Sequence, residues 1–206
     1  MNSNKIFVVG LNKSGTTSFH KLFLANGLKS YHKTDWVRRF NDKQDHKIRD
    51  YQCFSDGTAS NLKEIAKDYP EAIFILNTRS LKTWLISRFK HGYVTLNSSL
   101  RSVEKRGKPS WAYPPTKEKM ILWIAQRNNH YSDVLTYFMN EPTRLYLINI
   151  EEPDWENLIG DQLGFEVTDI EPANVRRNET IPIISQIKKL VDNTFLELGY
   201  NCNQID

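Results

Sequence analysis

KIFVVGLNKSGTTSFHKLF, residues 5–23, is the stretch that decides the fold of this 206-residue chain. Its first part, Ile6–Val9, is apolar and rich in β-formers, which predicts a buried strand. A short turn bracketed by Gly10 and Gly15 follows, and from Thr16 onward the apolar residues fall at helical spacing. A strand, a tight turn and a helix in this order bring backbone N–H groups and the positive end of a helix dipole to one place. The stretch therefore predicts an anion site.

The turn differs from the commonest phosphate-binding loop, in which a lysine directly follows the second glycine. Here Thr16 and Thr17 follow Gly15, and the lysine of the loop is Lys13, two residues before that glycine. A nucleoside triphosphate hydrolase would lose its usual phosphate-binding lysine in this arrangement. An ordinary strand-to-helix turn is the alternative, but such a turn requires neither the lysine nor the hydroxyl residues.

The motif NKSGTTS, residues 12–18, resembles the 5′-phosphosulfate loop of sulfotransferases that use 3′-phosphoadenosine 5′-phosphosulfate (PAPS). That family places a lysine, followed by Ser-Gly-Thr-Thr, against the bridging oxygen and the phosphosulfate. The resemblance implies that Lys13 is both catalytic and cofactor-binding. It also implies cofactor-binding roles for the other residues of the motif, which are Asn12, Ser14, Gly15, Thr16, Thr17 and Ser18.

A second stretch, AIFILNTRSLKTWLISRFKH at residues 72–91, again predicts a strand followed by a helix. Ser80 is a suitable cap for that helix, so Arg79 falls at the strand end and Ser87 about two turns along the helix. Sulfotransferases bind the 3′-phosphate of PAPS with an Arg and a Ser at this spacing. The resemblance therefore assigns Arg79 and Ser87 to that phosphate, with a surface salt bridge and a solvated helix position as the alternatives.

Transfer of a sulfuryl group requires a base that takes the proton of the acceptor. His32 follows a predicted short strand at residues 28–31, at the edge of an α/β sheet where ligands collect. It is the first candidate for the base, and Asp35 is close enough in sequence to orient it. An ordinary surface histidine is the alternative. Asp56 resembles an acidic residue of some bacterial sulfotransferases and is the second candidate, although helix capping is the simpler explanation.

Residues 91–115 predict irregular chain, because glycine, proline, serine and asparagine interrupt the helical pattern there. The segment is basic and directly follows the predicted cofactor-binding helix. It is a candidate lid over the acceptor and favours an anionic acceptor such as a carbohydrate acid. A solvated, mobile loop is the alternative.

Near the C-terminus, EPANVRRNE at residues 171–179 resembles the end of bacterial sulfotransferases. The resemblance implies that Asn174, Arg176 and Arg177 reach the nucleotide end of the cofactor. A surface arginine pair is the alternative.

The composition limits the partners. The 28 basic and 24 acidic residues give a net charge of +4, which suits an anionic cofactor but is too small to indicate nucleic-acid or membrane binding. No apolar run reaches membrane-spanning length, and Cys53 and Cys202 lie far apart without metal-ligand spacing. We therefore expect a cytoplasmic protein that needs no metal and binds neither nucleic acid nor membrane. The oligomeric state stays open.

The alternation of strands and helices predicts a single α/β domain over residues 1–206, with a mainly parallel sheet flanked by helices. The resemblance implies a P-loop NTPase-like sulfotransferase fold. It also implies transfer of a sulfuryl group from PAPS to a hydroxyl or amine of a small-molecule or glycan acceptor, leaving adenosine 3′,5′-bisphosphate. A small-molecule kinase, which would bind ATP with magnesium, and a nonenzymatic nucleotide-binding module are the alternatives.

Overall fold

The computed structural model describes residues 5–57, 61–100, 115–167 and 183–200. The chain divides into two compact units. The first unit comprises Met1–Thr78 and Asn129–Val175, and the second comprises Arg79–Asn128 and Arg176–Asp206. The glycine-bracketed loop belongs to the first unit, whereas Arg79 and Ser87 belong to the second.

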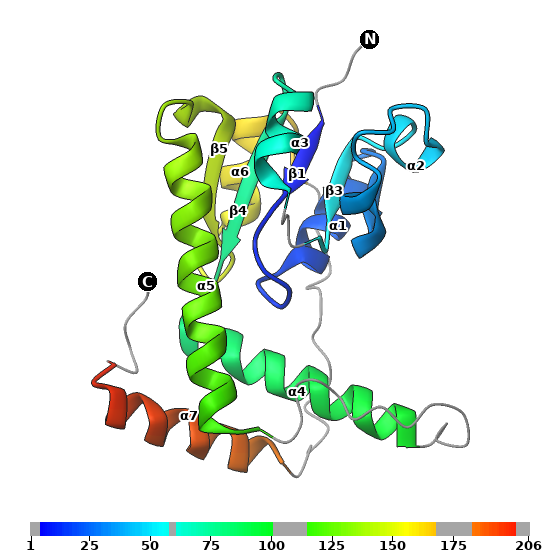
Figure 1. Cartoon of the computed structure of the whole chain (residues 1–206). Helices are drawn as coiled ribbons and strands as arrows, with labels where there is room; N and C mark the ends of the chain where they lie inside the picture. Colours follow the sequence, from blue (N-terminus) through cyan, green and yellow to red (C-terminus); the bar gives the residue numbers. More distant parts are fainter. Residues whose placement is uncertain (1–4, 58–60, 101–114, 168–182, 201–206) are drawn as a thin grey trace. The chain divides into compact units, whose positions relative to one another are not determined.

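The first unit is built on a five-stranded sheet with the strand order β2-β3-β1-β4-β5 (Figure 1). Every pair of neighbouring strands is parallel, which confirms the predicted parallel sheet. Because β1 is the central strand, the loop that follows it opens at the middle of the carboxyl edge, where ligands of such sheets bind. The strands are β1 (Ile6–Val8), β2 (Ser30–His32), β3 (Cys53–Ser55), β4 (Ile73–Thr78) and β5 (Leu145–Asn149).

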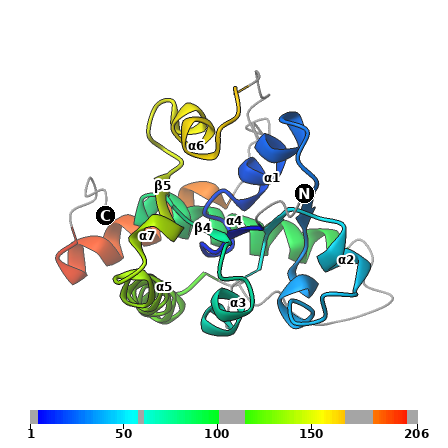
Figure 2. The same cartoon turned by 90° about the horizontal axis from the view of Figure 1, so that it is seen from above.

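Helices cover both faces of this sheet. Successive side chains of a strand point to opposite faces, and here the side chains on both faces are apolar and pack against helices. Ile6 and Val8 pack in one cluster with residues of α1 (Thr16–Ala25) and α6 (Trp155–Leu163). Phe7 packs in the other with residues of α3 (Leu62–Asp68) and of the end of α5 (Lys117–Phe138). Figure 2 shows α1 and α6 on one side of the sheet and α3 on the other. Three short helices complete this unit: η1 (Thr34–Arg38), α2 (His46–Arg49) and η2 (Pro142–Arg144).

The strand register brings polar residues to the carboxyl edge. The last residues of β2 and β3, His32 and Ser55, lie directly opposite each other. In the β1–β4 pair Val8 lies opposite Ile75, so Asn77 falls beside the start of the loop. The edge that holds the loop therefore also holds the polar ends of its neighbouring strands.

The second unit is helical in its described part. It contains α4 (Leu81–Leu100), the first residues of α5, and α7 (Ile184–Leu198), and α4 packs against α7. The ring of Phe89 on α4 lies 4.7 Å from that of Trp123 on α5. A salt bridge of 2.7 Å between Lys82 and Asp192 joins α4 to α7.

Helix α4 continues through Gly92 to Leu100, so the prediction of irregular chain from residue 91 is wrong for residues 91–100. A single glycine inside a helix costs about 1 kcal/mol, which is too little to end it. Residues 101–114 lie outside the described residues, as do Asn174, Arg176 and Arg177.

Candidate active site

The loop between β1 and α1 carries unusual backbone conformations. Lys13 has φ 73°, in the left-handed region, and Gly15 has φ 100°. The left-handed region costs a non-glycine residue about 1–2 kcal/mol, and strain of this kind gathers at functional sites. A Cβ atom at Gly15 would lie 2.5 Å from Ile150 Cδ1, so only glycine fits where the loop passes β5.

Asn77 of β4 clamps both ends of this loop. Its Oδ1 accepts a hydrogen bond of 2.9 Å from the N–H of Gly10. Its Nδ2 donates to the carbonyl oxygen of Ser14 at 2.8 Å and to the Ser14 hydroxyl at 2.9 Å. Asn77 and Ser14 are both fully buried, and the Ser14 hydroxyl also donates to the carbonyl of Leu11. The side chain of Ser14 thus holds the loop in shape, a role that its place in the motif does not reveal.

The amino end of α1 is arranged to receive an anion. Its N-cap is Gly15, and its described first turn carries neither a side-chain cap nor an acidic residue. The N–H groups of such a turn and the helix dipole favour negative charge. Thr16 is buried in this turn, while Thr17 and Ser18 are partly exposed beside it. The turn therefore leaves its N–H groups in the arrangement that an anion would need, and the anion site itself stays a prediction.

His32 lies beside this turn. Its Nε2 is 3.3 Å from Thr17 Oγ1, and its Nδ1 shares a hydrogen bond of 2.8 Å with the hydroxyl of Ser55. Its ring stacks on that of His20, with the centroids 5.0 Å apart and the planes at 17°. His20 in turn shares a hydrogen bond of 2.8 Å with Ser30. The first candidate for the base is thus in contact with the predicted phosphosulfate motif.

The surroundings of His32 favour its neutral form. Burial lowers its pKa below the ordinary value of 6.5; Asp56 opposes this shift and Lys13 adds to it. Burial also lowers the pKa of His20, and His32 lowers it further. A neutral imidazole has one ring nitrogen with a free lone pair, which is what a general base needs.

Asp35 does not orient His32. Its carboxylate accepts a hydrogen bond of 2.8 Å from the Tyr31 hydroxyl and pairs with Lys47 at 2.7 Å. The reason is the two-residue period of a strand: Tyr31 and His32 point to opposite faces, and Asp35 lies on the Tyr31 side. The group bonded to His32 Nδ1 is the hydroxyl of Ser55.

Asp56, the second candidate for the base, directly follows β3 and has φ 65°. The N-cap of α3 is Asn61, so capping of that helix does not explain Asp56. Its charge acts on His32, as the pKa of His32 shows.

The comparisons with known proteins agree with this geometry. The family model described as "Sulfotransferase domain" matches residues 5–180. The chain belongs to the sulfotransferase domain family. The crystal structure of a sulfotransferase from Alicyclobacillus acidocaldarius superposes with a TM-score of 0.51 at 15% sequence identity, covering 98% of each chain. At that identity the likeness supports the fold alone. No curated protein sequence matches the chain.

In this sulfotransferase domain, Arg79 directly follows β4, and its Nε donates to Thr83 Oγ1 at 3.0 Å. Arg127 of α5, which is 2% exposed, donates to the backbone carbonyl of Arg79 at 3.0 Å. Ser87 is half-buried on α4, in the second turn. Arg127 was not predicted, because nothing in a helical pattern marks which polar residue will turn inward.

His130 of α5 is another residue that sequence patterns missed. Its Nε2 donates to the carbonyl of Val9, at the base of the loop, over 2.7 Å. Burial lowers its pKa. The contact ties α5 to the end of β1.

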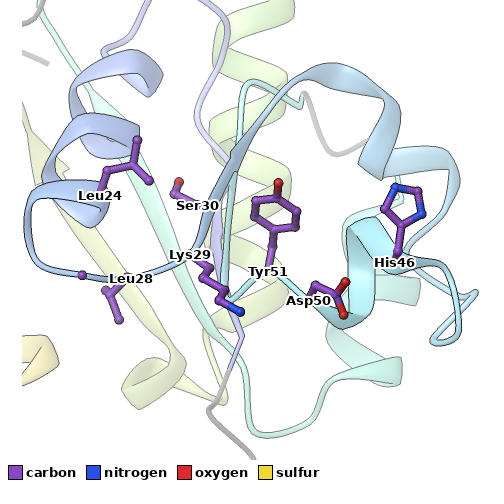
Figure 3. Close-up of a pocket in the computed structure, with 8 residues that line it drawn as sticks. Leu24, Leu28, Lys29, Ser30, His46, Asp50 and Tyr51 are labelled. Atoms are coloured by element: carbon purple, nitrogen blue, oxygen red, sulfur yellow. The ribbon is translucent and has the colours of Figure 1, made fainter.

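A pocket of about 480 Å³ lies elsewhere in this unit (Figure 3). It opens at the carboxyl end of α1, about 12 Å along the helix from the phosphate loop. Its lining residues are Leu24, Gly27, Leu28, Lys29, Ser30, His46, Asp50 and Tyr51. None of the predicted site residues lines it.

The described ranges of the chain contain neither a metal-ligand cluster nor a membrane-spanning helix. Among these residues no group of three His, Cys, Asp or Glu side chains is placed to hold a metal ion. In the same part of the chain no helix combines the length and apolarity required to cross a bilayer.

Proposed function

We propose that this sulfotransferase domain transfers a sulfuryl group from PAPS to a hydroxyl or amine of a small-molecule or glycan acceptor. The acceptor atom forms a bond to sulfur, and the bond from sulfur to the bridging oxygen of the 5′-phosphate breaks. The acceptor's proton passes to the base, and adenosine 3′,5′-bisphosphate is released. No metal takes part in this proposal. The observation that carries it is the contact of half-buried His32, whose pKa is lowered by burial, with the hydroxyl of Thr17 at the start of α1.

Lys13 and the loop amides stabilise the charge that develops on the bridging oxygen, and Thr16 and Thr17 add hydroxyl donors. The strained backbone of Lys13 supports this assignment, because the surrounding loop keeps it at a left-handed φ of 73°. The remaining motif residues, Asn12, Ser14, Gly15 and Ser18, shape or line the same loop.

His32 is the proposed general base, and its Nε2 takes the proton of the acceptor. General-base catalysis contributes about 10²–10⁴-fold in rate, so a His32→Ala variant should lose turnover on this scale. Asp56→Asn, the matched test of the second candidate, should lose much less. Equal turnover of His32→Ala and the unaltered protein would remove His32 from the mechanism and make Asp56 the next candidate.

We propose that Arg79 and Ser87 bind the 3′-phosphate of PAPS, the role that the family resemblance implies. Arg176 and Arg177 are proposed to contact the nucleotide end of the cofactor. The planar guanidinium of Arg79 suits a bidentate contact with phosphate. An Arg79→Ala variant should therefore weaken cofactor binding more than turnover, whereas Lys13→Ala should mainly reduce turnover.

Calorimetric binding tests the donor directly. Adenosine 3′,5′-bisphosphate, ADP with magnesium, and 5′-AMP would be titrated in parallel into the full chain. We expect clear preference for the bisphosphate, because the proposal requires recognition of both its phosphates. Equal or stronger binding of ADP with magnesium would overturn the proposal in favour of a kinase.

A further inference from the structure

The contact between His32 and Ser55 is built into the sheet. The two residues end adjacent parallel strands and face each other in the register. Their side chains share a hydrogen bond of 2.8 Å, between His32 Nδ1 and Ser55 Oγ. The alternation of side chains along β2 and β3 keeps both on the α1 face of the sheet, so the bond needs no help from a mobile loop.

Ser55 is held rigidly. It is fully buried, and its backbone carbonyl accepts a hydrogen bond of 3.2 Å from the indole Nε1 of Trp36. Trp36 is itself fully buried, with its ring 5.4 Å from that of Phe7 on the central strand. Since the core holds its backbone, Ser55 offers His32 a hydroxyl on a fixed strand end.

The ring of His20 stacks on one face of the His32 imidazole, and Ser55 lies at one of the two nitrogens of His32. The other nitrogen, Nε2, is the one on the Thr17 side. The charged groups that act on His32 are Asp56 after β3 and Lys13 in the loop, and the imidazole of His20 faces it from α1.

We infer that Ser55 is the positioning residue of His32: its hydroxyl accepts the Nδ1–H of the neutral imidazole and so leaves the lone pair on Nε2. This inference rests on the proposed function, in which Nε2 takes the proton of the acceptor. When Nε2 takes that proton, the hydrogen bond from Nδ1–H to the Ser55 hydroxyl remains, and the ring keeps its orientation. The serine hydroxyl thus selects the tautomer that can act as a base toward the loop.

Nitrogen-15 NMR of the histidine rings in the full chain reads this tautomer without any need for turnover. At pH 7.5 we expect His32 to carry its proton on Nδ1. In a Ser55→Ala variant the protonated nitrogen should shift toward Nε2. In the same variant kcat should fall about tenfold or more, part of the contribution of a general base, with little change in KM for PAPS. Ser55→Thr, which keeps the hydroxyl, should restore the Nδ1–H tautomer.

Ser30→Ala is the matched control. Ser30 is also a buried strand serine, 5% exposed, and its hydroxyl contacts a histidine at the same distance of 2.8 Å. That histidine is His20, so the substitution should change the His20 resonances and leave the tautomer of His32 and kcat close to those of the unaltered protein. A purely structural role of Ser55 predicts similar losses for both alanine variants.

A His32 that carries its proton on Nε2 in the unaltered protein would overturn the inference, even if Ser55→Ala fails to fold. The same holds for a Ser55→Ala variant with unchanged tautomer and kcat. These outcomes differ from failure of the proposed function, which would show as preference for ADP with magnesium and absence of sulfuryl transfer. In that case the NMR result would still decide whether Ser55 sets the tautomer of His32.

Discussion

Replacing Asn77 by alanine should destabilise the protein severely, because this one side chain makes three hydrogen bonds to the loop between β1 and α1. The substitution removes the acceptor of the Gly10 N–H and the donor to the Ser14 carbonyl. It also removes a donor to the Ser14 hydroxyl, which keeps its bond to the carbonyl of Leu11. The site is fully buried, so water cannot readily replace the amide.

The magnitude follows from the groups left behind. A buried backbone N–H or C=O that loses its partner costs about 1–3 kcal/mol, and Asn77→Ala leaves two of them. We therefore expect a decrease of about 2–6 kcal/mol in the free energy of unfolding. That is a large share of the 5–15 kcal/mol typical of a folded protein. The loop should also open locally, so affinity for adenosine 3′,5′-bisphosphate should fall together with stability.

Urea denaturation followed by circular dichroism measures the first effect, and hydrogen exchange of the Gly10 amide measures the second. Asn26→Ala is the control, since the Asn26 side chain makes one half-buried bond of 2.8 Å to the carbonyl of Leu22 at the far end of α1. Its loss should cost only about 0.5–1.5 kcal/mol. If Asn77→Ala loses no more stability than this, and the Gly10 amide stays equally protected from exchange, then Asn77 does not hold the two ends of the loop together.

Asn77→Asp sharpens the same test. One carboxylate oxygen can still accept from Gly10, but the other would face the Ser14 carbonyl oxygen, which now accepts at 2.8 Å. Only a protonated carboxyl can donate there, so its pKa should rise in the folded state. The stability deficit relative to the unaltered protein should accordingly shrink as the pH falls.

Three further predictions concern backbone strain and acid. Gly15→Ala should lower the free energy of unfolding by about 2–5 kcal/mol, because its φ of 100° and the contact of 2.5 Å with Ile150 both oppose a Cβ. Gly27→Ala is the control: at φ 75° with open space around it, the same urea denaturation should show a loss of about 1–2 kcal/mol. Lys13→Gly should leave stability unchanged or raise it by up to about 1 kcal/mol, since it relieves a left-handed lysine, and should nevertheless abolish measurable sulfuryl transfer; a marked loss of stability would contradict the strain. Acidification should lower the free energy of unfolding from about pH 7 downward, because burial depresses the folded-state pKa of three histidines below 6.5 and the unfolded chain binds protons first. Glutamine variants at these histidines should flatten that dependence, and a flat profile for the unaltered protein would contradict it. The histidines are His20, His32 and His130.

Local patterns in the sequence were sufficient to predict the loop and the sheet. The run Ile6–Val9, the paired glycines and the helical spacing after Thr16 lie within twenty residues of one another, so their geometry depends on neighbours along the chain. Parallel pairing then follows from the order of strands and helices. The prediction failed at residues 91–100 because the cost of Gly92 inside a helix was overestimated. A long helix tolerates that cost of about 1 kcal/mol and continues.

Contacts between distant residues could not be predicted in this way. Asn77 is 67 residues from Gly10, and His130 is 121 residues from Val9. One signal was nevertheless available: Asn77 is a polar residue inside the apolar run IFILNT, where a buried amide must find partners. A second signal was the two-residue period of the strand, which places Tyr31 and His32 on opposite faces of the sheet. Because Asp35 bonds to Tyr31, it lies on the face away from His32 and cannot orient it.

Burial separates two kinds of polar residue at the carboxyl edge of this sheet. Ser14, Ser55 and Asn77 are fully buried, and their bonds go to the loop or to His32. Lys13, Thr17 and His32 are partly exposed and are the groups that a ligand can reach. A buried polar residue must satisfy its hydrogen bonds within the protein, so it is suited to holding a neighbouring group in place. The parallel strands thus do more than carry the loop to the sheet edge, because buried polar residues at their ends hold the loop and His32 by hydrogen bonds.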